Sequence, residues 1–183
     1  LIFTSSTIKM NQFQKTNSNI EYFFSGVNFD VFNKFDTSFK IPQLKNKDIK
    51  IIGFHGALRS ILDKNLILKI AKKFPNDQIV LLGPKHDNFK KLENYKNINF
   101  IGEIKHSEIP KYINNFDIGI LPYRVNKFTN SVNPAKLNEY LILGIPVVSK
   151  NIEQINNFNT LNDEIINVAN DDEEFLDLIE KIF

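Results

Sequence analysis

Residues 51–84 read IIGFHGALRSILDKNLILKIAKKFPNDQIVLLGP. One apolar run ends just before Gly56, and a second, 78–82, ends at Gly83. Between the two runs, apolar side chains recur at the three- and four-residue spacing of an amphipathic helix (Leu62, Leu66, Ile67, Ile70, Ala71). Pro75 follows and interrupts the helical pattern. Two short apolar strands separated by a helix predict a βαβ unit with parallel strands.

The same alternation continues to the end of the chain. We expect further strands at 98–101, 118–121, 146–149 and 165–168, and helices at 107–115, 134–143 and 171–183. This order predicts an α/β fold with a doubly wound, Rossmann-like parallel sheet. Ligands of such sheets bind beyond the carboxyl ends of the strands, so the residues that follow each strand are the candidates for function.

The first fifty residues show a different pattern. We expect a strand at 1–4, a short helix near 8–14 and a strand at 20–24, and residues 36–48 are polar, rich in lysine and contain Pro42. We therefore divide the chain into 1–35, a linker at 36–49 and a domain at 50–183. The chain opens inside a predicted strand and not with methionine, which we interpret as a fragment of a longer protein.

Composition excludes several classes of function. The net charge of +2 is too balanced for a dedicated nucleic-acid-binding protein. The chain has no cysteine, which excludes disulfides and thiolate metal sites, and its three histidines lack metal-ligand spacing. We expect no metal site. No apolar run approaches the roughly 20 residues that cross a bilayer.

The stretch from residue 130 to residue 141, NSVNPAKLNEYL, holds the most informative polar side chains. Asn133 and Pro134 are the residue types preferred at the N-cap and first position of a helix. Lys136 and Glu139 lie three residues apart and share one polar edge. A helix N-terminus with a lysine favours a phosphate, and the glutamate suits a ribose diol. Spacing alone favours a simpler interpretation, a capped helix with a surface Lys–Glu pair.

Other candidates follow the predicted strands. Gly56 lets backbone approach a ligand closely. Arg59, Lys64 and Arg124 are phosphate ligands or solvated surface charges. His55 is an acid or base, or a partly buried histidine at a strand end, and we prefer the second interpretation.

Taken together, the chain resembles the C-terminal domain of group 1 (family 4) glycosyltransferases of the GT-B fold. The resemblance rests on the order and spacing of residues 97–102, 109–113, 116–122, 133–140 and 144–148. Residues 2–6 and 24–30 resemble the end of that family's N-terminal domain, so 1–35 would be the tail of an acceptor-binding domain and 50–183 the nucleotide-sugar-binding domain.

The resemblance implies transfer of a sugar, with retention, from a nucleotide-diphosphate sugar to a hydroxyl acceptor, without a metal or another cofactor. It assigns Glu139 to the ribose hydroxyls, and Lys136 with the backbone near Asn133 to the diphosphate. Gly56 would let the diphosphate approach, and backbone around Ile104 would meet the base. It assigns no catalytic residue in this chain.

The resemblance also implies a cytoplasmic enzyme, and it leaves peripheral association with the inner face of the membrane open. The acceptor, a carbohydrate or a lipid-linked one, would be bound by the N-terminal domain, so the fragment alone should be inactive. Two positions depart from the family pattern: Ser131 stands where a second glutamate is common, and Ala57 where an arginine is common. The alternatives are a sugar-nucleotide epimerase or hydrolase of the same fold, and a non-catalytic nucleotide-binding or assembly module.

Overall fold

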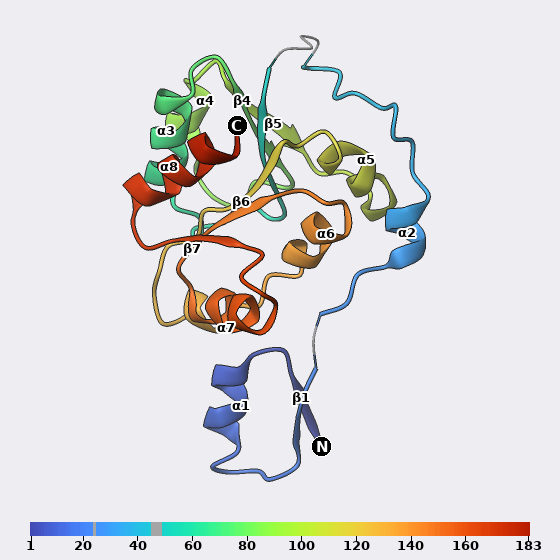
Figure 1. Ribbon diagram of the computed structural model, residues 1–183, viewed down its shortest axis with the longest axis vertical. Helices are drawn as coiled ribbons and strands as arrows, with labels where there is room; N and C mark the ends of the chain where they lie inside the picture. Colours follow the sequence, from blue (N-terminus) through green and yellow to red (C-terminus); the bar gives the residue numbers. More distant parts are fainter. Residues whose placement is uncertain (24, 45–48) are drawn as a thin grey trace.

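The computed structural model describes residues 1–23, 25–44 and 49–183. Its largest element is a six-stranded parallel sheet in the order β5-β4-β3-β6-β7-β8 (Figure 1). The strands are β3 (Ile51–His55), β4 (Gln78–Leu82), β5 (Ile98–Gly102), β6 (Ile118–Leu121), β7 (Val147–Lys150) and β8 (Asn167–Ala169). The predicted doubly wound parallel sheet is confirmed.

Helices cover both faces of this sheet. They are α3 (Lys64–Lys73), α4 (Lys90–Glu93), α5 (Ile109–Ile113), α6 (Lys136–Ile142), α7 (Glu153–Leu161) and α8 (Asp172–Ile182). In Figure 1, α3, α4 and α8 lie to one side of the strands, and α5 and α6 to the other. Short 3₁₀ turns at His106–Glu108 and Thr129–Ser131 precede α5 and α6.

The strand order places a crevice at the centre of the sheet. The chain moves outward from β3 to β4 and β5, then returns to add β6 on the other side of β3. Consecutive connections therefore leave β3 and β6 in opposite directions, and in doubly wound sheets the ligand binds beyond the carboxyl ends at this reversal. The four central strands, β4, β3, β6 and β7, are almost wholly buried, as expected for a sheet covered by helices.

Two facing glycines make room for an aromatic side chain above this crevice. Gly53 of β3 pairs in register with Gly119 of β6. A Cβ atom on Gly119 would lie 2.7 Å from the ring of Tyr140, and one on Gly53 would lie 2.0 Å from the ring of Phe116. Gly119 thus lets Tyr140, which is fully buried, pack directly on the sheet and fix α6 to it, and Gly53 gives room to the neighbouring ring of Phe116.

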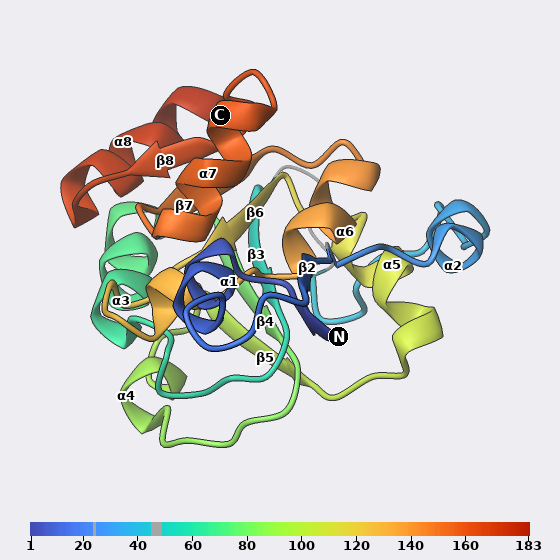
Figure 2. The same cartoon turned by 90° about the horizontal axis from the view of Figure 1, so that it is seen from below.

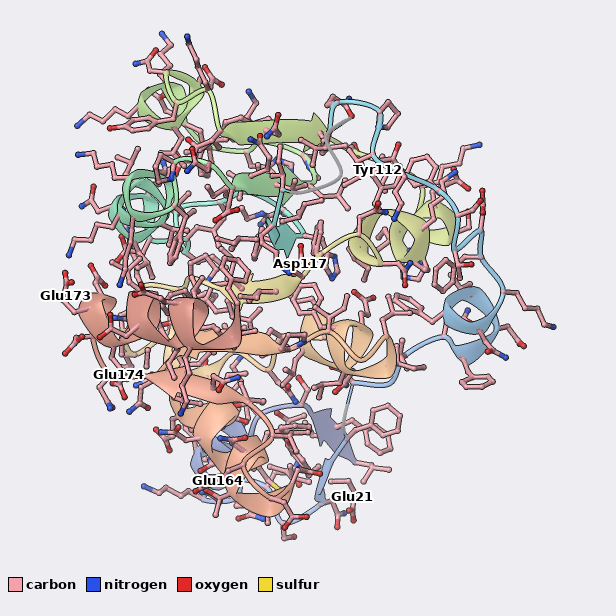
Figure 3. The ribbon with its side chains drawn as sticks, turned by 45° about the horizontal axis from the view of Figure 1, so that its top comes forward. Glu21, Tyr112, Asp117, Glu164, Glu173 and Glu174 are labelled. Atoms are coloured by element: carbon pink, nitrogen blue, oxygen red, sulfur yellow. The ribbon has the colours of Figure 1, made fainter. Side chains whose placement is uncertain are left out.

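The helices α3 and α8 lie side by side on one face. Asp63 caps α3 by accepting hydrogen bonds from the amides of Asn65 and Leu66. Lys69 of α3 contacts Asp172 at 3.0 Å in the acidic first turn of α8, where Figure 3 labels the neighbouring glutamates 173 and 174. The helix predicted at 171–183 is confirmed.

The N-terminal residues form a small unit of their own. It consists of β1 (Ile2–Thr4), α1 (Thr7–Phe13) and β2 (Ile20–Tyr22), with the two strands parallel, and Figure 2 shows it from below, in front of the main sheet. The side chain of Gln154 in α7 joins it to the domain, because its amide donates to Thr7 Oγ1 at 2.8 Å. This unit therefore lies near the carboxyl edge of the main sheet.

The segment after β2 packs against the domain. It contains α2 (Phe29–Asn33), and both Phe32 and Ile41 are buried in the main core. Ile41 belongs to the predicted linker, so the described part of that linker is anchored by an apolar side chain. Residues 45–48 of the linker, and residue 24 of the predicted strand 20–24, lie outside the described residues. The three domain limits stay predictions.

The helix predicted at 134–143 differs from the structure in its start. The helix α6 begins at Lys136, its N-cap position is Ala135, and no side chain caps it. The prediction that Asn133 is the N-cap and Pro134 the first helical residue is wrong. The reason is that the chain first makes a tight turn, in which the amide of Leu137 donates to Pro134 O at 2.9 Å. Asn133 instead hydrogen-bonds Tyr22 of the N-terminal unit.

Three helices, α2, α4 and α7, were not expected from the sequence, and the last strand begins two residues later than expected, at Asn167. Among the described residues, no helix is long and apolar enough to cross a membrane.

Candidate functional site

A cavity of about 190 Å³ lies beyond the carboxyl ends of β3, β4 and β5. It is lined by His55, Gly56, Leu82, Gly83, Pro84, Glu103, Ile104 and Ile109. Two of the predicted ligand-contacting residues, Gly56 and Ile104, are in this set. The cavity therefore stands where the strand order predicts a ligand, with backbone from three successive strand-end turns around it.

The turns after β3 and β4 form one wall and depend on glycine. Gly56 and Gly83 have φ values of +124° and +137°, a region that other residues rarely adopt. A Cβ atom on Gly83 would lie 2.2 Å from the carbonyl oxygen of Gly56. The amide of Gly56 donates to Leu82 O at 2.8 Å, so the parallel pairing continues past the end of β3.

The helix α6 reaches the cavity through Tyr140. Its hydroxyl accepts a hydrogen bond of 3.0 Å from the backbone amide of His55 at the end of β3. The rings of His55 and Tyr140 also pack edge to face, with centroids 5.1 Å apart. Because Glu139 directly precedes Tyr140, this contact brings the Glu139 carboxylate next to the imidazole.

The Glu139 carboxylate lies between two imidazoles. Its Oε2 is 2.8 Å from Nε2 of His55, whose side chain is 6% exposed, and its Oε1 is 3.6 Å from Nε2 of His106, which is 59% exposed. The His55–Glu139 contact has the distance of an ion pair. Its angles do not meet the geometry of a hydrogen bond, so the buried His55 Nε2 has no hydrogen-bond partner and the contact is an electrostatic one. The carboxylate therefore keeps acceptor capacity.

Burial and neighbouring charges set the protonation of this pair. Burial lowers the pKa of His55 from its ordinary value of 6.5, Glu139 raises it, and Lys136 and His106 lower it again, with a net decrease. Burial raises the pKa of Glu139, but His55, His106 and Lys136 lower it below 4.5 overall. At neutral pH we therefore expect a neutral imidazole beside an ionised carboxylate.

Lys136 lies against the turn after β3, at Gly56. Its Nζ donates to the hydroxyl of Tyr123 at 2.9 Å and stands 5.3 Å from the centroid of the Phe54 ring. A Cβ atom on Gly56 would lie 2.9 Å from Lys136 Cε, so the lysine stem passes directly over the Gly56 backbone. Among the described residues, Lys136 has no carboxylate within 4.0 Å. An aromatic-lined cation without a carboxylate partner is suited to an anionic ligand.

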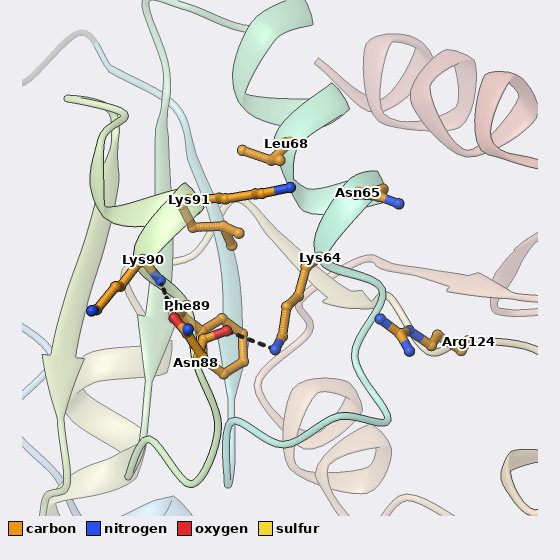
Figure 4. Close-up of a pocket in the computed structure, with 9 residues that line it drawn as sticks. Lys64, Asn65, Leu68, Asn88, Phe89, Lys90, Lys91 and Arg124 are labelled. Carbon is orange, nitrogen blue, oxygen red and sulfur yellow. Dashed lines mark hydrogen bonds between the residues drawn. The ribbon is translucent and has the colours of Figure 1, made fainter.

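The structure does not bring the predicted arginines to this cavity. Arg59 lines a separate hollow with Ser60, His86 and Asp87. Arg124 faces a third hollow, between α3 and α4, together with Lys64, Lys90 and Lys91 (Figure 4). Lys64 is engaged there, because its Nζ contacts Asp87 at 3.0 Å and donates to Asn88 O at 2.7 Å. Gly56, Ile104, Lys136 and Glu139 are thus brought to one end of the sheet, whereas Arg59 and Arg124 line other hollows. Asn133 lies in the chain just before the turn that begins α6.

The sequence interpretation missed the role of the residues that assemble the site. His55 was expected as a hydrogen-bonded histidine at a strand end, but nothing local showed that its partner is Glu139. The signal was Gly119 in the middle of a buried strand, which admits the ring of Tyr140 on the sheet. In the described ranges, no three His, Asp or Glu side chains are grouped to hold a metal ion.

Comparison with known proteins decides the family. The model of the family described as "Glycosyl transferases group 1" matches residues 49–183, which is most of the chain and includes every element of the site. The chain belongs to the group 1 glycosyltransferases. The suspected resemblance is confirmed.

Individual relatives agree with this family. The glycosyltransferase chain is 30% identical over 132 residues to TuaH of Bacillus subtilis (strain 168), named as a candidate teichuronic acid biosynthesis glycosyltransferase. Sucrose-phosphate synthase of Thermosynechococcus elongatus superposes with a TM-score of 0.70 over 98% of the chain, at 15% identity. Alr3699/HepE of Anabaena, in complex with UDP and glucose, superposes with a TM-score of 0.68 over 99% of it, at 13% identity.

These relatives are longer. The chain covers 33% of TuaH, 48% of the sucrose-phosphate synthase and 53% of HepE. At 15% and 13% identity, the sucrose-phosphate synthase and HepE structures show that the chain shares their fold, and they do not establish its activity.

The lowered pKa of His55 makes the stability of this glycosyltransferase chain depend on pH. In the unfolded chain residue 55 takes up a proton near pH 6.5, whereas the folded chain resists protonation until lower pH. The unfolded state therefore binds more protons in this window, and stability falls as the pH drops. We expect the wild type to lose more free energy of unfolding than His55→Gln between about pH 7.5 and about pH 5.5. Urea unfolding at several pH values measures this, and parallel profiles for the two proteins would contradict the assignment.

Proposed function

We propose that the chain is the donor-binding half of an enzyme that transfers a sugar from a nucleotide-diphosphate sugar to a hydroxyl acceptor, with retention. One observation carries the proposal: the amine of Lys136 and the carboxylate of Glu139 lie at the carboxyl edge of the sheet, beside the Gly56 turn, and have different partners. The two charges are thus separately available to a ligand that carries both an anion and a diol.

The chemistry of a nucleoside diphosphate fits this arrangement. A diphosphate needs a cationic donor and room to approach the backbone. Lys136 provides the cation, and Gly56, which has no side chain, provides the room. The negative charge on the departing diphosphate would be stabilised by the lysine. A ribose diol needs an acceptor, which the Glu139 carboxylate provides. The base would then meet the backbone near Ile104 in the cavity. No metal or other cofactor is part of this proposal.

The relatives support the same ligand class. HepE structures were determined with UDP and with UDP-glucose, and they share the fold of this chain. The acceptor, a carbohydrate or a lipid-linked one, would be bound by the remainder of a longer protein, and nucleotide sugars place the reaction in the cytoplasm or at the inner face of the membrane. We expect this chain alone to bind donor nucleotide without turnover.

The cluster of His55, Glu139 and His106 is the one observation that favours the alternative, an epimerase or hydrolase of the same fold. Such enzymes need acid–base groups that touch the substrate. The His55 imidazole, however, is buried, and its Nε2 points to Glu139, so this nitrogen is not available to a substrate. Conversion of a sugar nucleotide by the purified chain, followed by NMR, would favour this alternative.

Calorimetric titration with UDP, GDP, dTDP and ADP tests the proposal. We expect one nucleotide to bind most tightly, and Glu139→Ala to weaken that binding by about 1–3 kcal/mol, the value of charge-assisted hydrogen bonds. Glu21→Ala is the matched control, since Glu21 is exposed on β2 of the N-terminal unit (Figure 3). Equal affinity in Glu139→Ala and Glu21→Ala would refute the role of Glu139, and no binding of any nucleotide would refute the donor-binding role of this chain.

A further inference from the structure

The site contains a charge pair that does not form. Lys136 and Glu139 are separated by three positions on α6, a spacing at which a lysine and a glutamate can form an ion pair. In this structure the amine contacts Tyr123 and the carboxylate contacts His55, and no Lys136–Glu139 contact falls within 4.0 Å. Each of the two charged groups therefore has another partner, Tyr123 for the amine and His55 for the carboxylate.

The buried imidazole of His55 is the neighbour that draws the Glu139 carboxylate away from Lys136. His55 Nε2 and Glu139 Oε2 are 2.8 Å apart, and both side chains are largely shielded from water. At this distance the nitrogen must carry its proton, because two acceptors would repel one another. An N–H dipole in a poorly hydrated place attracts a carboxylate more strongly than it would in water.

The two carboxylate oxygens have different surroundings. Oε2 faces His55, which the backbone contact with Tyr140 fixes at the end of β3. Oε1 faces the more distant and exposed His106 at 3.6 Å. One oxygen is thus anchored to the sheet, and the other faces a side chain that an incoming hydroxyl can displace.

We propose that His55 is a positioning residue that holds the Glu139 carboxylate toward the ribose of the nucleotide and away from Lys136. This inference rests on the proposed function, because it assigns the ribose to Glu139. It gives His55 no contact with the substrate. Without the imidazole, Glu139 would rotate toward Lys136, and the site would lose its ribose acceptor and part of its phosphate charge.

A comparison of two ligands isolates this role. The probes are the ribonucleoside diphosphate that binds most tightly among UDP, GDP and ADP, with UDP as the first choice, and its 2′,3′-dideoxy analogue. The variants are His55→Leu, which fills a similar volume without a donor, and His55→Gln, whose side-chain amide restores an N–H donor. His106→Ala is the control, since it removes the exposed imidazole on the same carboxylate. Unfolding curves confirm that each variant is folded.

We expect the wild type to bind the natural nucleotide about 10-fold or more tightly than the dideoxy analogue, because charged hydrogen bonds to the diol are lost. In His55→Leu this ratio should fall to about 1–2, with recovery in His55→Gln and little change in His106→Ala. A folded His55→Leu protein that keeps the wild-type ratio would overturn the inference, as would a His55→Gln protein that recovers none of it. A wild-type ratio near one would instead refute the proposed ribose contact of Glu139, and with it the proposed function of that residue.

Discussion

Gly83→Ala is expected to lower the free energy of unfolding by about 3–5 kcal/mol, the sum of a strained backbone and a steric clash. The φ of +137° disfavours any side chain there. The added Cβ would also lie 2.2 Å from the carbonyl oxygen of Gly56, which is backbone and moves only if the β3 turn moves. The expected decrease is large because one methyl group would separate the two turns that line the cavity.

Gly102→Ala is the matched control. Gly102 also has a positive φ, +86°, but a Cβ atom there would meet nothing within 4 Å. We expect this variant to lose only the backbone contribution, about 1–2 kcal/mol. Urea unfolding of the two variants and the wild type measures the difference. Similar losses in the two would show that Gly56 and Gly83 are not packed as closely as the structure has them.

Lys136→Met is expected to weaken nucleotide binding by about 2–3 kcal/mol, which is a loss of about 30- to 150-fold. The substitution keeps the apolar stem that crosses Gly56 and packs near the rings of Phe54 and Tyr123, and it removes the charge together with the hydrogen bond to the Tyr123 hydroxyl. The diphosphate would then face the glycine turn without its cation. The amine has no carboxylate partner among the described side chains, so its removal leaves no unpaired acidic group, and the expected loss of stability is that of one hydrogen bond, about 1 kcal/mol.

The control for this variant is Lys91→Met. Lys91 belongs to the other basic hollow, between α3 and α4, where Arg124 also lies (Figure 4). Calorimetry should give wild-type affinity for Lys91→Met at the same ionic strength. A loss of affinity in Lys91→Met with none in Lys136→Met would show that the diphosphate binds in the α3–α4 hollow. Arg124, which the sequence offered as a phosphate ligand, lines that hollow.

Local sequence was sufficient for the sheet. Each strand is an apolar run bounded by glycine, proline or polar residues, so its position could be predicted without knowledge of its neighbours. That Lys136 and Glu139 lie on the same edge of a helix also follows from their three-residue spacing alone. Both are short-range properties, which explains why the fold class was predicted correctly and why the two charged residues could be expected on one edge of a helix. Their role in ligand binding stays a prediction.

Long-range contacts account for what the sequence did not predict. Asn133 has the character of an N-cap residue, yet the chain reaches α6 through a turn at Pro134, and Asn133 contacts Tyr22 instead. Arg59 and Arg124 follow strands, as a ligand-binding residue would, but their side chains line other hollows. Position along the chain placed them at the correct edge of the sheet, and it could not give the direction in which they point.

A nucleoside diphosphate is proposed to bind beside Gly56, at the reversal of the strand order. A crystal structure of the chain with the nucleotide selected by calorimetry would locate it. We expect the diphosphate over the Gly56 turn within hydrogen-bonding distance of Lys136 Nζ, and the ribose hydroxyls at Glu139. A nucleotide bound instead in the hollow of Arg59 or in that of Arg124, with Lys136 and Glu139 both without contact to it, would refute this binding site.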